Sequence, residues 1–299
     1  MFLILALLAS AAHAQCPPPL PAPSGAKPVD RGLLWSVTKD GRRSWLYGTM
    51  HVGRTDWWLP GPKTTAALQA SDVLALELDP GDPQVQRDLA QAMAAPAPAL
   101  PAELRARLAK QAERACIDGA LFATLHPGMQ ATLLALAEAR RVGLDAGYGS
   151  EQSLTQWARG AKRPVVSLET VALQARVLMP DDPASLKTLA EQTLEPLEAG
   201  EGTVVMERLA QAWERGDEAQ LADYERWCRC VKTEADRAAL RALNDDRNPG
   251  LADRIAALHG DGKRVFAAVG ALHMTGRQAL PRLLAARGFA VERVPFGVP

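Results

Sequence analysis

The sequence has no excess of either charge, because 34 lysine and arginine residues balance 34 aspartate and glutamate residues. A chain without such a bias has no broad electrostatic attraction for nucleic acid or anionic lipid, so neither is expected as a partner. It also lacks a Gly-x-Ser-x-Gly motif, which disfavours a serine hydrolase with its nucleophile on a strand-to-helix turn. Its first apolar run is shorter than the roughly 20 residues needed to span a membrane. An integral membrane protein is therefore not expected.

The start of the chain has the pattern of a secretory signal peptide. Residues 1–14 are apolar and end in Ala12 and Ala14, small residues at the positions that a signal peptidase reads. No lysine or arginine precedes the apolar stretch, although signal peptides usually carry one. We expect cleavage before Gln15 and a periplasmic or secreted protein. The N-terminal residue of protein from the native host checks this, since an intact Met1 would contradict it.

The chain has only four cysteines, Cys16, Cys116, Cys228 and Cys230, and all remain after that cleavage. An even number of cysteines in an exported protein suggests disulfides, and three pairings are possible. Cys228 and Cys230 are too close for an easy bridge with each other, so we expect each to pair with Cys16 or Cys116. A metal site is the alternative, but the Cys-x-Cys pair lacks the second Cys or His pair of a structural zinc site.

The rest of the chain, at 47% hydrophobic and 23% charged residues, is typical of a globular protein. Residues 15–30 form a proline-rich tether, and residues 31–299 form one domain. Apolar runs predict strands at 33–37, 44–50, 72–78, 163–170, 264–270 and 289–294. Helical patterns occupy 60–71, 83–145, 184–258 and 277–288. This order predicts an α/β or α+β fold, with a mixed central sheet from both chain ends, flanking helices and a mid-chain helical insert.

Two of the predicted strands end in the same Gly-x-x-His pattern. "LYGTMHVG" contains His51 and "VGALHMTG" contains His273. Each glycine permits a sharp turn at the strand end, and ligands of α/β proteins bind at the carboxyl edge of the sheet. A histidine there is often only structural. Two of them beside one carboxylate, however, predict a divalent metal site open to water and substrate.

Three acidic residues are candidates for that carboxylate. Glu77 is the one charge inside the apolar run "VLALEL", and Glu169 ends the run "VVSLE". A buried charge is costly unless it is paired or bound to metal, although Glu77 could instead pair with Arg54, a further candidate for substrate binding. Glu151 starts a predicted helix after a glycine-rich turn, where it is either a ligand or an acid favoured by the helix dipole.

Arg247 and Asn248 lie at another predicted helix start, in "DDRNPGLADRI". A guanidinium and an amide can hold a carboxylate or a carbonyl group, so both residues are candidates for the catalytic site.

These motifs resemble the TraB/GumN family, which is related to the Tiki proteases that act on Wnt proteins. The resemblance covers about residues 32–295. It rests on the order of "LYGTMHVG", "SDVLALELD", "GYGSEQSL", "KRPVVSLET", "DDRNPGLADRI" and "VGALHMTGRQALPRLLAARGFAVERV". In place of Glu151, many relatives have an aspartate.

The resemblance implies a fold like that of the erythromycin esterase and ChaN-like group. It also implies metal-dependent hydrolysis, with His51, His273, Glu77 and Glu169 around zinc, manganese or cobalt. Arg247 and Asn248 match the family's Arg-Asn pair. The expected substrate is a peptide or another small molecule. Two alternatives stay open: a protein that binds haem or metal without turnover, and an exported module whose histidines are only structural.

Overall fold

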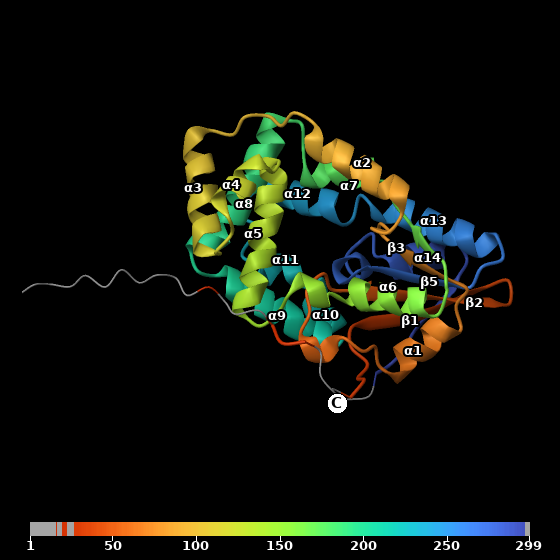
Figure 1. Ribbon diagram of the computed structural model, residues 1–299. Helices are drawn as coiled ribbons and strands as arrows, with labels where there is room; N and C mark the ends of the chain where they lie inside the picture. Colours follow the sequence, from red (N-terminus) through yellow and green to blue (C-terminus); the bar gives the residue numbers. More distant parts are fainter. Residues whose placement is uncertain (1–15, 17–19, 23–26, 297–299) are drawn as a thin grey trace, which may run out of the picture.

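The computed structural model describes residues 16, 20–22 and 27–296 (Figure 1). The predicted signal peptide, residues 1–14, lies outside the described residues. Within them, no helix is both long and apolar enough to cross a membrane.

The centre of the fold is a six-stranded sheet with the order β4-β3-β5-β2-β1-β6. The strands are β1 (Leu33–Lys39), β2 (Arg42–Thr49), β3 (Val73–Leu76), β4 (Val165–Ser167), β5 (Val265–Gly270) and β6 (Ala290–Arg293). Neighbours among β4, β3, β5 and β2 run parallel, whereas β1 and β6 add antiparallel pairs. Strands from both chain ends thus share one mixed sheet, which confirms the predicted fold class.

The first two predicted strands form a hairpin. Asp40 and Gly41 connect β1 to β2 and have φ angles of 51° and 71°. Two consecutive positive φ angles fit a tight turn whose twist matches that of the strands, and Asp-Gly is a favoured pair for it. The hairpin places β2, and with it the first Gly-x-x-His, next to β5.

Helices flank the sheet and also build the insert (Figure 1). Those that contact the sheet or follow its strands are α1 (Pro62–Gln69), α6 (Ser150–Gly160), α7 (Val171–Leu178), α13 (Asn248–Gly260) and α14 (Leu280–Ala286). The others are α2 (Pro83–Ala94), α3 (Ala102–Arg114), α4 (Gly119–Thr124), α5 (Pro127–Arg141), α8 (Pro183–Glu198), α9 (Gly202–Glu214), α10 (Glu218–Ala222), α11 (Tyr224–Trp227) and α12 (Glu234–Leu243). Short 3₁₀ turns are η1 (Thr55–Trp57), η2 (Ala146–Tyr148) and η3 (Ala271–Met274).

The insert has a hydrophobic core of its own. Leu108 of α3, Leu134 of α5, and Leu186 and Leu194 of α8 are almost completely buried against one another. A separate core covers the sheet and includes the buried Phe266 of β5. Burial of each such side chain contributes about 1.5–3 kcal/mol. The helical insert therefore packs as a separate layer with its own core.

The disulfides correct the expected pairing. Cys16 is bonded to Cys116, and Cys228 is bonded to Cys230, with Cα–Cα distances of 5.7 and 5.1 Å. Arg229 has a φ of 58°. This left-handed conformation turns the chain sharply enough for the two neighbouring cysteines to meet, which is why the objection from their short separation was wrong. The Cys16 bridge still ties the proline-rich segment to the body.

The end of the proline-rich segment is attached to the body. Val29 forms a β-bridge with Pro60. The carboxylate of Asp30 accepts hydrogen bonds from the backbone N–H groups of Lys63 (3.0 Å) and Thr64 (2.9 Å). These are free N–H groups in the first turn of α1, so Asp30 acts as its cap from outside the helix.

Candidate active site

Four neighbouring parallel strands each deliver one candidate residue to the same edge of the sheet. Because β4, β3, β5 and β2 are parallel, their carboxyl ends lie together. The residues that leave these ends are, in the same order, Glu169, Glu77, His273 and His51. Ligands of open α/β sheets bind at this edge. The topology therefore brings four side chains that are distant in sequence to one place.

Three of the four groups expected to bind a metal ion lie close to Gly270, the last residue of β5, while the fourth, Glu169, is paired with Arg247. Gly270 is the register partner of Thr49, the last residue of β2. A Cβ atom added at Gly270 would lie 3.4 Å from Glu77 Oε1, 3.5 Å from His273 Cδ2 and 3.8 Å from His51 Nε2. The structure therefore places both imidazoles and one carboxylate around the same small space.

Arg247 joins the two carboxylates of the site. Its Nη2 donates to Glu77 Oε2 at 2.6 Å and to Glu169 Oε1 at 2.8 Å, and its Nε donates to Glu169 Oε2 at 3.1 Å. Its Nη1 lies 3.5 Å from His273 Nε2. The side chains of Arg247, Glu77 and Glu169 are only 12%, 13% and 3% exposed. A buried guanidinium thus balances two buried carboxylates, which would otherwise be strongly unfavourable.

Asn248 fixes the orientation of His273. The Asn248 amide nitrogen donates to the backbone carbonyls of His273 (3.2 Å) and Gln278 (2.7 Å), which leaves its oxygen facing His273 Nδ1 at 2.6 Å. An amide oxygen only accepts, so Nδ1 carries the proton and Nε2 presents a lone pair to the site. Burial lowers the pKa of His273 to about 4, and the ring is therefore neutral at neutral pH.

His51 is held from the other side by Glu151. His51 Nδ1 lies 2.7 Å from Glu151 Oε1, and the His51 side chain is 65% exposed. The negative charge of Glu151 raises the pKa of His51 to about 9. Hydrogen bonds between Met50 and Ser150 pin the two segments together, at 2.8 and 2.9 Å. A Cβ atom on Gly149 would lie 2.5 Å from the His51 carbonyl oxygen, so this close approach requires glycine.

Substitution Glu151→Gln is expected to return the pKa of His51 from about 9 toward its ordinary value of 6.5. The amide keeps a hydrogen-bond acceptor but loses the charge that stabilises the imidazolium. Because folding raises this pKa, the pair stabilises the wild-type fold most below pH 6.5, and the contribution disappears as the pH rises through about 9. NMR titration of the histidine ring protons measures the change. An unaltered titration curve in the variant would contradict the pairing.

The two carboxylates of the site differ in their acidity. Burial raises the pKa of Glu77, but the charges of His273, which is protonated in acid, and of His51 and Arg247 outweigh it and lower the pKa to about 2. In Glu169, burial is the larger influence and raises the pKa above its ordinary value. Glu77 therefore remains a carboxylate over the whole neutral range, as a metal ligand must.

One contact of this site was not anticipated from the sequence. Gln174 of α7 donates from its amide nitrogen to Glu77 Oε2 at 3.2 Å. The only indication in the sequence was its position, because Gln174 lies near the start of the helix that follows Glu169. A glutamine at such a position is common in proteins, so the position alone did not identify it as part of the site.

Arg54 is not part of the contacts around Gly270. Its Nη1 donates to the Val142 carbonyl at 3.2 Å, and its guanidinium lies 5.6 Å from the ring centre of Trp57. Among the described residues Glu77 is paired with Arg247, and the alternative pairing of Glu77 with Arg54 is not observed. The structure thus gives Arg54 contacts with the loop after α5 and with η1.

The donor types at Gly270 suit a divalent ion, but the distances are not those of a formed metal site. Each imidazole has an oxygen atom at Nδ1, and Glu77 supplies a carboxylate. Nε2 of His273 is unprotonated at neutral pH, whereas His51 would have to lose its Nε2 proton to bind an ion. His273 Nε2 and Glu77 Oε1 are 4.0 Å apart. Across residues 16, 20–22 and 27–296, no group of three or more His, Cys, Asp or Glu side chains is arranged to hold a metal ion.

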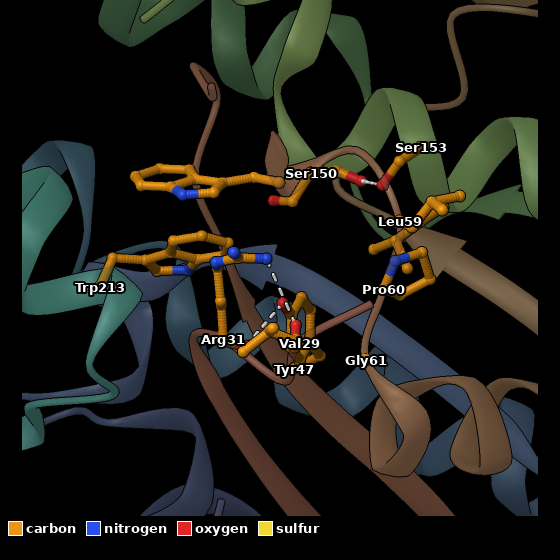
Figure 2. Close-up of a pocket in the computed structure, with 11 residues that line it drawn as sticks. Val29, Arg31, Tyr47, Leu59, Pro60, Gly61, Ser150, Ser153 and Trp213 are labelled. Atoms are coloured by element: carbon orange, nitrogen blue, oxygen red, sulfur yellow. Dashed lines mark hydrogen bonds between the residues drawn. The ribbon is translucent and has the colours of Figure 1, made fainter. Parts of the chain in front are cut away.

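A small pocket lies near the start of α6, and none of the site residues predicted from the sequence is among those that line it (Figure 2). Tyr47, Trp57, Trp213 and Ser150 are among its lining residues, and the Tyr47 hydroxyl donates to the Arg31 carbonyl at 2.9 Å. Its volume of about 10 Å³ holds about one water molecule. This pocket is too small for a substrate.

The model of the TraB/PrgY/gumN family matches residues 33–293. No curated protein and no solved structure matches the chain.

Proposed function

Because this chain belongs to the TraB/PrgY/gumN family, we propose that it is an exported, metal-dependent hydrolase that cleaves peptide bonds at the carboxyl edge of its sheet. The observation that carries the proposal is the meeting of His51, His273 and Glu77 around Gly270. Two imidazoles and a carboxylate are a common donor set of hydrolytic metal sites.

The ion would be held by Nε2 of His51, Nε2 of His273 and the carboxylate of Glu77. Zinc, manganese and cobalt all accept such ligands. When bound, the ion supplies a Lewis acid for the scissile carbonyl and lowers the pKa of water to near neutral, as in known zinc hydrolases.

The remaining residues of the site orient the three donors. Asn248 accepts a hydrogen bond from Nδ1 of His273, and the Glu151 carboxylate lies 2.7 Å from Nδ1 of His51, so each ring is held from its Nδ1 side. Gln174 and Arg247 fix the orientation of Glu77. Arg247 also keeps a positive charge beside the reaction site, where it favours a developing oxyanion.

The same groups offer proton transfer when no ion is bound. At neutral pH His273, with a pKa of about 4, has a free lone pair, while His51, with a pKa of about 9, carries a proton. A base and an acid with pKa values shifted in opposite directions can share one hydrolytic reaction. A chelator therefore distinguishes hydrolysis that needs a metal ion from hydrolysis by the two histidines alone.

Export is proposed on two grounds. The residues before Gln15 have the pattern of a signal peptide, and the described chain has two disulfides, Cys16–Cys116 and Cys228–Cys230. Disulfides persist in oxidising compartments such as the periplasm and the cell exterior.

Incubation of the purified protein with a proteome-derived peptide library is expected to generate new peptide termini, detected by mass spectrometry. Cleavage should stop after treatment with a chelator and return with zinc, manganese or cobalt. Cleavage that survives complete metal removal would refute the dependence on metal and would point to acid–base catalysis by His51 and His273. No cleavage, together with a haem absorbance band on the purified protein, would support a binding protein instead.

A further inference from the structure

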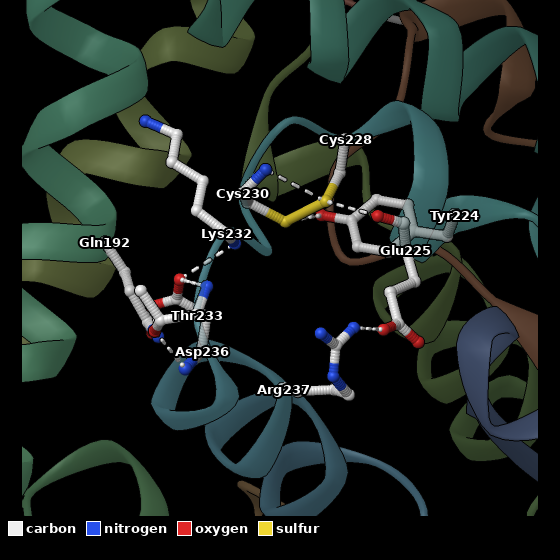
Figure 3. Close-up of a disulfide and its surroundings, with 9 residues drawn as sticks. All are labelled: Gln192, Tyr224, Glu225, Cys228, Cys230, Lys232, Thr233, Asp236 and Arg237. Atoms are coloured by element: carbon white, nitrogen blue, oxygen red, sulfur yellow. Dashed lines mark hydrogen bonds and ion pairs between the residues drawn. A yellow bond between two sulfur atoms is a disulfide. The ribbon is translucent and has the colours of Figure 1, made fainter.

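The disulfide between Cys228 and Cys230 lies between α11 and α12 (Figure 3). A single residue, Arg229, separates the two cysteines and has a φ of 58°. Left-handed backbone is unfavourable for a residue with a Cβ atom. Closing this bridge therefore keeps Arg229 in a strained conformation, and opening it allows the backbone to relax.

The two disulfides differ strongly in what they contribute to the fold. Cys16 and Cys116 are 100 residues apart, whereas Cys228 and Cys230 are 2 apart. In the chain-entropy account, a bridge stabilises a protein by restricting its unfolded chain, and the effect grows with loop length. The Cys228–Cys230 bridge restricts very little chain. Strained disulfides of this kind are the ones that are easily reduced.

The two sulfur atoms have different surroundings. Cys228 is completely buried, while Cys230 is partly exposed. The backbone N–H of Cys230 donates to Cys228 Sγ at 3.1 Å. The hydroxyl of Tyr224 lies 4.0 Å from Cys230 Sγ. An incoming thiol can therefore reach Cys230, and the N–H group is placed to stabilise Cys228 as a departing thiolate.

A groove of about 790 Å³ lies between α10, α11 and α12, and although neither cysteine lines it, the residue after Cys230 does. Val231, the residue after Cys230, lines it together with Asp223, Glu225 and Arg226 around α11 and Arg237 of α12. Its volume falls in the range of ligand sites, and its lining carries both charges. The groove is thus large enough for several residues of a polypeptide and suits a polar chain.

We propose that Cys228–Cys230 is a thiol–disulfide exchange site that oxidises a pair of cysteine thiols in a polypeptide bound in this groove. A substrate thiolate attacks Cys230 Sγ, the Cys228–Cys230 bond breaks, and Cys228 leaves as a thiolate. The second substrate thiolate then attacks the substrate sulfur of the mixed disulfide and releases Cys230, whose sulfur faces the Tyr224 hydroxyl. The substrate leaves with a disulfide, and its two thiol protons end on Cys228 and Cys230.

Equilibration of the native protein with glutathione redox buffers, followed by alkylation and mass spectrometry, tests the first requirement. The Cys228–Cys230 bridge is expected to be half-reduced at a glutathione ratio at least about tenfold less reducing than the Cys16–Cys116 bridge requires. Reduction of both bridges together, or of Cys16–Cys116 first, would overturn the proposal.

Two substitutions of Arg229 test the origin of the reactivity. Arg229→Gly removes the backbone strain, whereas Arg229→Ala keeps it, and both lose the ion pair of Arg229 with Glu201. The glutathione ratio at which the bridge is half-reduced is expected to be about fivefold more reducing for the glycine variant than for the alanine variant. Equal midpoints for the two variants would contradict the strain argument.

Reaction with a synthetic peptide that carries two cysteines tests the substrate class. The wild-type protein is expected to oxidise one equivalent of this peptide and to become reduced at Cys228 and Cys230. Cys228→Ser, which has no bridge at this site, should oxidise none. Reaction with glutathione but not with the peptide would contradict a polypeptide substrate. Neither result depends on the hydrolytic site.

Discussion

Replacement of Arg247 by leucine is expected to lower the free energy of unfolding by about 3–5 kcal/mol at neutral pH. In the wild type, the Arg247 guanidinium donates to the buried carboxylates of Glu77 and Glu169 at 2.6 and 2.8 Å. Without it, two negative charges remain close together with little access to water. Urea denaturation at pH 7 measures the loss.

The pH dependence of the stability lost in Arg247→Leu shows whether the unpaired carboxylates cause it. The wild-type pKa of Glu77 is lowered to about 2 from 4.5, so its stabilising contribution is complete above pH 4.5 and disappears as the pH falls toward 2. The difference between wild type and Arg247→Leu should therefore narrow in acid. Arg237→Leu is a suitable control, because Arg237 forms exposed ion pairs and its replacement should cost far less stability than that of Arg247. Equal losses for the two variants would contradict a buried charge network.

Substitutions His51→Ala and His273→Ala are each expected to reduce peptide cleavage roughly a thousandfold in kcat/KM. Each removes an imidazole beside Gly270, because a Cβ atom added at this glycine would lie 3.8 Å from His51 Nε2 and 3.5 Å from His273 Cδ2. His51 is 65% exposed, so its loss should leave the fold intact. Cleavage of the most reactive library peptide, compared at equal folded protein concentration by circular dichroism, measures the effect.

A third histidine provides the control for these variants. His126 accepts a hydrogen bond from the Gly128 N–H at the start of α5. His126→Asn keeps a good helix cap and should change cleavage by less than about twofold. Retention of activity in either His51→Ala or His273→Ala would refute a shared site for the two imidazoles.

Much of the fold was predictable because its signals are local. The Asp40-Gly41 turn and the apolar runs around it indicated the β1–β2 hairpin, and short apolar runs indicated β3, β4 and β5. The repeated Gly-x-x-His pattern suggested that β2 and β5 share a sheet, and they are adjacent and parallel. The strands that follow the two Gly-x-x-His segments are not equivalent, however. β3, which follows the first segment, lies beside β5, whereas β6, which follows the second, pairs antiparallel with β1 at the far edge of the sheet.

The parts that escaped prediction depend on contacts between distant segments. The sequence indicated that Arg247 could bind a carboxylate. It did not show that its partners are Glu77 and Glu169, which are 170 and 78 residues away. Nor did it show that Asn248 orients His273 (2.6 Å). The Cys228–Cys230 bridge was missed for a local reason, since the left-handed backbone of Arg229 has no signature in an arginine.

Metal content tests the central claim most directly. Protein purified without chelator, then loaded with zinc, manganese or cobalt and analysed by elemental mass spectrometry, is expected to hold about one ion per chain. His51→Ala and His273→Ala should each lose it, and Gly270→Ala should bind more weakly, because its methyl group would lie 3.4 Å from Glu77 Oε1 and 3.8 Å from His51 Nε2. A wild-type protein without bound metal under all three loading conditions, or one histidine variant that keeps its ion, would contradict the account.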